Sequence, residues 1–73
     1  MKYIIANKAK AADVGFEIEY HRTKGNQIML NEKEVMSNAI LKGTKLKERA
    51  EQMDGTVCTE KQALTEINNG GWK

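Results

Sequence analysis

Two side chains in this sequence have the chemistry of a nucleophile and a base. Cys58 is the single cysteine of the chain and His21 is its single histidine. A catalytic thiol needs a lowered pKa and a base within hydrogen-bond reach. Cys58 stands in a short apolar segment, where a free cysteine is typically a small buried residue, and His21 falls on the polar side of an alternating segment. We therefore expect no thiol catalysis and no enzyme activity.

Acidic side chains are the other candidates for chemistry, because carboxylates bind metals and transfer protons. The four glutamates in the first half of the chain are the candidates: Glu17, Glu19, Glu32 and Glu34. Their spacing does not match a calcium-binding loop, and one cysteine with one histidine cannot supply the four ligands of a structural zinc site. Gly70 and Gly71 follow a predicted helix, so they indicate a helix end and not a phosphate-binding loop. The sequence predicts no metal and no cofactor.

The length favours a single small domain over residues 1–73. A chain of 73 residues is small, and such a domain hides only about 60% of its unfolded surface. A single cysteine excludes an internal disulfide, which leaves very good packing or a homo-oligomer as sources of stability. The 12 basic and 10 acidic side chains are interleaved, as on a solvated surface rather than a nucleic-acid-binding stripe.

Targeting signals are missing from the pattern as well. The apolar run Tyr3–Ala6 is too short for a secretory signal, and no segment approaches the roughly 18 apolar residues of a membrane span. A lone thiol fits a reducing compartment. We expect a cytoplasmic accessory or regulatory protein, bacterial or phage, that does not bind membranes.

The first third of the chain predicts a strand, a helix and a second strand. Tyr3–Ala6 has the length and composition of a strand, and Asn7 can cap a helix over residues 8–14 that ends before Gly15. Apolar and polar residues then alternate from Phe16 to Arg22, which is typical of a strand with one buried face.

A turn at residues 23–26 predicts a β-hairpin over residues 16–30. A three-residue loop at residues 24–26 would pair Tyr20 with Leu30 and Arg22 with Ile28, which places the apolar side chains on one face. A two-residue loop at Lys24 and Gly25 would move them to the acidic face, so we favour the longer loop. In this register Met29 points to the polar side.

The second half predicts three helices and a short strand. Asn31 can cap a helix reaching about residue 40, Thr44 can cap a helix over residues 45–54, and residues 56–59 suit a strand. Thr59 and Gln62 form a capping box for a last helix whose inward side chains are Ala63, Leu64 and Ile67. The order β-α-β-β-α-α-β-α predicts an α+β fold, with three or four short helices packed on one face of a small sheet.

Residues 44–69 partly resemble a helix-turn-helix, in which the second helix enters the major groove of DNA. The side chains able to contact DNA in this reading are Lys61, Thr65 and Asn68 on the second helix, with Lys45 and Arg49 on the first. The link at residues 55–59 is longer than the three or four residues of that motif, and acidic residues lie beside the basic ones. We therefore keep a DNA-binding regulator as the alternative.

Trp72 and Met29 are the two residues that suggest a protein partner. Trp72 follows the last helix and either folds back over the core or anchors a partner, since tryptophan is enriched in binding hot spots. Met29 is predicted to be exposed beside an edge strand, where it could join a subunit contact. Our first hypothesis is a non-enzymatic protein that binds a partner protein or a second copy of itself.

Overall fold

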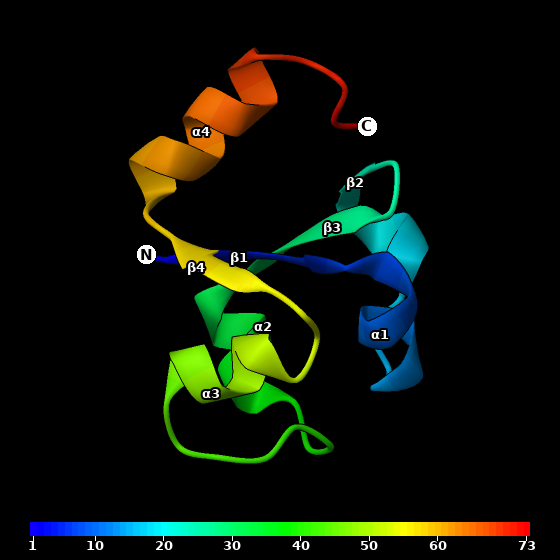
Figure 1. The fold of residues 1–73 in the computed structure, drawn as a ribbon, viewed down its shortest axis with the longest axis vertical. Coiled ribbons are helices and arrows are strands. Elements are labelled where there is room, and N and C mark those ends of the chain that lie inside the picture. Colours follow the sequence, from blue (N-terminus) through cyan, green and yellow to red (C-terminus); the bar gives the residue numbers. More distant parts are fainter.

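The computed structural model describes all residues 1–73, and the elements follow the predicted order (Figure 1). The strands are β1 (Tyr3–Asn7), β2 (Arg22–Lys24), β3 (Gln27–Asn31) and β4 (Thr56–Cys58). The helices are α1 (Lys8–Asp13), α2 (Glu32–Ser37), α3 (Leu46–Glu51) and α4 (Glu60–Asn68), with a 3-10 turn η1 (Ile18–Tyr20). The predicted α+β class is confirmed.

The four strands form one antiparallel sheet in the order β2-β3-β1-β4. The strands β1 and β3 are central, and they pair along their whole length from Tyr3 opposite Asn31 to Asn7 opposite Gln27. The short strands β2 and β4 are the two edges. The sheet therefore depends on β1, which contacts both β3 and β4.

Helices cover both faces of this sheet, as Figure 1 shows. On one face α1, α2 and α3 enclose the larger core, which contains Ile4, Ala6, Ala11, Ile28, Leu30, Val35, Leu41, Ala50 and Met53. On the other face α4 and the tail enclose a smaller core of Met29, Ala63 and Trp72. Three helices thus share one face, as predicted, and the fourth lies on the opposite face.

The predicted strand over residues 16–22 is wrong. Phe16 remains hydrogen-bonded to the end of α1, because its N–H donates to the Ala11 carbonyl at 3.1 Å. The 3-10 turn η1 follows directly. Phe16 and Ile18 pack against the larger core, but Tyr20 is 76% exposed. A short alternation does not distinguish a strand from a 3-10 turn when both bury the same two side chains.

The hairpin register also differs from the prediction by one residue. Arg22 lies opposite Met29 and Thr23 lies opposite Ile28, so the loop contains only Gly25 and Asn26. Gly25 has φ +59°, as at the first central position of a type II′ turn. The hairpin itself is confirmed, but it spans residues 22–31.

The helix caps agree with the sequence at three of four places. The Asn7 and Asn31 side chains accept from the Lys10 and Glu34 N–H groups, and Thr59 forms the predicted capping box with Gln62, the third residue of α4. Thr44 caps nothing, because α3 begins one residue later and Lys45 holds the cap position without a side-chain hydrogen bond. Both α2 and α3 are shorter than predicted, ending at residues 37 and 51.

Gly55 is required by close packing between α3 and the sheet. A Cβ at this position would lie 3.0 Å from the Ala6 Cβ, 3.1 Å from the Ala50 carbonyl oxygen and 3.1 Å from the Ile4 Cγ2. We predict that Gly55→Ala lowers the free energy of unfolding by about 1–3 kcal/mol, because the core cannot absorb an extra methyl group. Urea unfolding measures this change.

The control is Ala12→Gln, at an exposed position of α1, where a longer side chain extends into solvent and glutamine is a good helix former. The control should unfold at nearly the same urea concentration as the unaltered chain. If Gly55→Ala were as stable as this control, the tight packing described here would be incorrect.

Candidate functional site

Cys58 and His21 do not form a catalytic pair. Cys58 lies in edge strand β4, and His21 precedes β2 at the opposite edge of the sheet. Three strand spacings separate the two edges, which corresponds to about 14 Å. Burial raises the pKa of the Cys58 thiol above the ordinary 9.0, and the nearby Glu66 carboxylate raises it further. The thiol is therefore protonated at neutral pH and is a poor nucleophile.

His21 is a brace between η1 and α2, although the sequence predicted a solvated side chain. Its Nε2 lies 2.7 Å from the Glu34 Oε2, and its Nδ1 lies 2.8 Å from the Glu17 carbonyl oxygen. The imidazole is only 10% exposed and meets the Phe16 ring edge to face at 6.1 Å. Both ring nitrogens are thus occupied by acceptors from the chain itself.

The predicted acidic residues do not converge on one point. Glu34 is paired with His21, the Glu32 Oε1 accepts from the Lys2 N–H at 3.2 Å, and Glu17 and Glu19 are exposed. No group of three or more His, Cys, Asp or Glu side chains is placed to hold a metal ion. No helix is long and apolar enough to span a membrane.

Met29 and Trp72 lie together inside the smaller core. Met29 is 7% exposed and Trp72 is 8% exposed, and both pack with Ala63. The Trp72 Nε1 donates to the Glu66 Oε1 at 3.4 Å. The expectation of an exposed Met29 beside a sheet edge was wrong. β3 is a central strand, and α4 covers the face of the sheet to which Met29 points.

The helices α3 and α4 do not form a helix-turn-helix, because β4 separates them and they pack on opposite faces of the sheet. The Arg49 guanidinium is bound to carbonyl oxygens of Gly43, Val35 and Asn38, at 2.9, 3.1 and 2.7 Å. Lys45 is exposed beside it. The other three predicted DNA-contacting residues are exposed on α4, across the sheet: Lys61, Thr65 and Asn68.

The two edges of the sheet differ in how their backbone groups are paired. At the β2 edge, the Thr23 N–H donates to the Lys73 carbonyl at 3.2 Å, and the Lys73 N–H donates to the Thr23 carbonyl at 2.9 Å. The C-terminal tail therefore adds one residue of strand to this edge. No segment of the chain does the same at β4.

The orientation of β4 follows from hydrogen bonds of β1. The Asn7 N–H donates to the Met53 carbonyl, on the β4 side of β1, so by alternation Tyr3 and Ile5 also face β4. Their partners are Cys58 and Thr56. The residue between these partners, Val57, consequently directs its N–H and carbonyl away from the sheet, and no hydrogen bond outside the sheet involves it.

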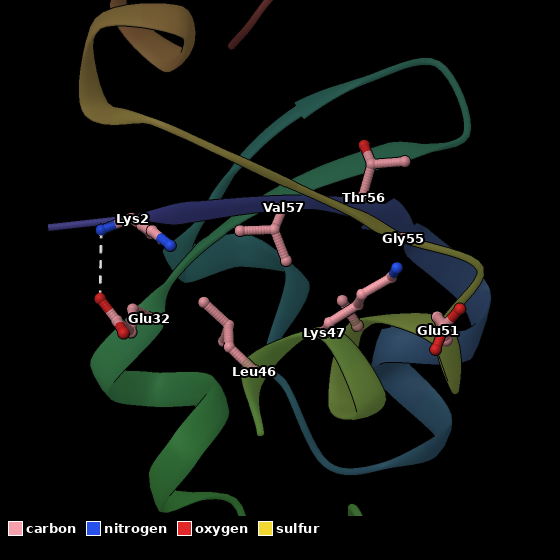
Figure 2. A pocket seen from close by; sticks show the side chains of 9 residues that line it. Lys2, Glu32, Leu46, Lys47, Glu51, Gly55, Thr56 and Val57 are labelled. Carbon is pink, nitrogen blue, oxygen red and sulfur yellow. Dashed lines mark hydrogen bonds between the residues drawn. The ribbon is translucent and has the colours of Figure 1, made fainter.

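A groove borders β4 on each face of the sheet. The first has a volume of about 590 Å³, with Leu46, Ala50 and Val57 as its apolar lining. Figure 2 shows Leu46 and Val57 side by side in it, with Lys2 and Glu32 at one end and Glu51 at the other. The second groove, about 500 Å³, lies between β4 and α4 and is lined by Ile5, Thr56, Val57, Cys58, Lys61, Gln62, Thr65 and Glu66.

A third groove of about 340 Å³ lies between α4 and the start of the hairpin. Tyr20 and Leu64 line it, and Leu64 is 53% exposed although the sequence predicted it to face inward. The inward side chains of α4 are Ala63 and Ile67. This groove is closed at one side by the His21–Glu34 brace and does not border a free sheet edge.

Comparisons of this chain with protein-family models, with curated proteins and with solved structures found no match.

The Cys58 environment predicts a slow thiol whose reactivity depends on Glu66. Alkylation by iodoacetamide should be slower than that of free cysteine near pH 8, and Glu66→Gln should accelerate it by lowering the thiol pKa. Glu60→Gln on the same helix is the control and should leave the rate unchanged. Because the folded thiol ionises at a higher pH than the unfolded one, stability should also fall as the pH rises past about 9.

The His21 brace predicts a specific loss of stability. Glu34→Ala leaves a nearly buried imidazole without its acceptor, which should cost about 1–3 kcal/mol of unfolding free energy. Glu34→Gln keeps an oxygen acceptor and should cost less. Glu19→Ala removes an exposed carboxylate with no hydrogen-bond partner and should change stability little; equal losses at both positions would contradict the brace.

Proposed function

We propose that this chain is a non-enzymatic interaction protein that binds an extended segment of a partner protein at the β4 edge of its sheet. The observation that carries the proposal is the outward-facing, unpaired backbone of Val57. An extended peptide can add to such an edge as a further strand, and the backbone hydrogen bonds then supply part of the affinity.

The opposite edge supplies a model for this contact within the same molecule. Thr23 occupies the outward position of β2, as Val57 does in β4, and its N–H and carbonyl are both bonded to Lys73. A partner residue opposite Val57 can form the same pair of hydrogen bonds. The chain thus already contains one strand addition, at the edge that its own tail can reach.

The two grooves beside β4 supply the side-chain contacts. Successive side chains of a strand point to opposite faces, so a segment paired with β4 places alternate side chains in the first groove and in the second. Leu46 and Val57 form an apolar floor in the first groove, with charged side chains at its ends. We therefore infer a partner segment that alternates an apolar side chain with polar ones.

The chemistry of the remaining candidates supports a binding role over catalysis. The Cys58 thiol has a raised pKa, and the single histidine is held by two acceptors on the far side of the sheet. No observation favours the DNA-binding alternative, because Arg49 is bound to backbone carbonyls and the exposed Lys61 lies on the opposite face of the sheet. Tight, salt-sensitive binding of duplex DNA would restore that alternative.

The test replaces the hydrogen of the Val57 N–H by a methyl group. Peptides are selected from a displayed library of random linear sequences, and their affinities are measured by calorimetry for the full chain and for a synthetic chain with N-methylvaline at Val57. This N–H faces solvent, so the fold should be kept. Loss of the hydrogen bond and the added methyl group should weaken binding at least about tenfold. Sarcosine at Gly25, in the exposed loop, is the matched control.

Amide hydrogen exchange locates the contact. Slower exchange of the Val57 N–H in the peptide complex, together with the affinity loss, supports the proposal. Peptides that bind the methylated chain equally well, or that protect other amides only, would refute it. The Val57 N–H could also become better protected as the concentration of the protein alone is raised. That result would identify the occupant of the β4 edge as a second copy of this chain and not a partner protein.

A further inference from the structure

The C-terminal tail is held to the body of the protein by a small number of separable contacts. Trp72 packs against Met29 and Ala63 in the smaller core, and Lys73 makes its two backbone hydrogen bonds to Thr23. The Trp72 Nε1 adds one bond to Glu66. These contacts have the character of a bound peptide: one anchoring ring and one strand-like residue.

Two consecutive glycines join this tail to α4. Gly70 and Gly71 both have φ +89°, in the region that other residues rarely adopt. A Cβ at Gly70 would meet nothing within 4 Å, so close packing does not require glycine there. Glycine populates both signs of φ with similar ease, so the segment can redirect the tail with little conformational strain.

We propose that the tail exchanges between two copies of this chain, so that Trp72 and Lys73 of one copy occupy the core and β2 edge of the other. Every contact of the closed chain is then formed between copies, and only the direction of residues 69–71 changes. Such exchange is an inexpensive route to a dimer, because the new interface repeats contacts that the monomer already makes. Met29 and Trp72 become contact residues of that dimer.

The reach of the tail sets the arrangement of the two copies. Four residues from Gly70 onward extend at most about 14 Å. The β2 edges of the two copies must therefore lie side by side, related by a two-fold axis, with each tail crossing to the other copy. The free β4 edges lie on the far sides of both sheets, so the exchange leaves them open.

The closed chain is the competitor of the exchanged dimer. A short flexible link gives its own tail an effective concentration in the millimolar range, so exchange should become appreciable as the protein approaches that concentration. The dimer population therefore depends on concentration, and it depends on Trp72 because the ring is the main apolar contact of the tail.

A disulfide trap tests the exchange directly. Thr23 and Lys73 form a hydrogen-bonded antiparallel pair, for which the Cα atoms lie about 5.5 Å apart, within disulfide range. Chains carrying Cys58→Ser with Thr23→Cys are mixed with chains carrying Cys58→Ser with Lys73→Cys, and oxidised. A covalent heterodimer between positions 23 and 73 forms efficiently when a tail occupies the other copy, and otherwise forms only by random collision.

The heterodimer yield should rise as the protein concentration is raised from roughly 0.05 mM to roughly 2 mM. This range brackets the effective concentration that a short link gives. The collision control replaces Thr23→Cys by Ser37→Cys, at the exposed end of α2. The exchange pair should exceed this control by about an order of magnitude, because docked groups react at high effective concentration. Trp72→Ala in the Lys73→Cys chain should reduce the yield to that of the control, and circular dichroism confirms that each chain is folded.

A chain with both Thr23→Cys and Lys73→Cys completes the experiment. It should cross-link within itself at low concentration, which verifies the geometry of the closed tail. If it does so while the mixed chains yield no more heterodimer than the collision control, exchange does not occur. Failure of the doubly substituted chain to cross-link would also overturn the proposal, because the tail would not occupy the β2 edge.

Discussion

The burial of β1 and β3 on both faces is the constraint on which the rest of this structure depends. A sheet with one solvated face needs helices on one side only. In β1 both the even-numbered and the odd-numbered residues are apolar or half-buried, so both faces must be covered by helices. Ile4 and Ala6 enter the larger core, whereas Tyr3 and Ile5 pack against the smaller one. A chain of 73 residues must therefore divide its helices between two thin cores.

This division explains both what the sequence could predict and what it could not. The caps at Asn7, Asn31 and Thr59 were predictable because each involves a side chain and a backbone N–H only three residues apart. The hairpin register was not, because it depends on what covers the second face. The uninterrupted apolar runs Tyr3–Ala6 and 28–30 were the available signal, since alternation is lost in strands that are buried on both sides.

The candidate site was less accessible to sequence than the fold. The sequence suggested Trp72 and Met29 as partner contacts, and only the structure shows that they pack in the same small core. Val57 carries no functional signal in the sequence, because the proposed contact depends on the direction of its backbone at a sheet edge. Which strand becomes an edge is decided by the pairing of all four strands, and that pairing is a property of the whole chain.

The central position of β1 also has a consequence for synthesis of the protein. β1 is made well before β4, with which it pairs, and before Trp72, which belongs to the core on its second face. Contacts between such distant segments slow folding, because the loop must close before they form. The nascent chain therefore exposes the apolar run Tyr3–Ala6 until these later segments have been made, and during that time the run is open to a chaperone.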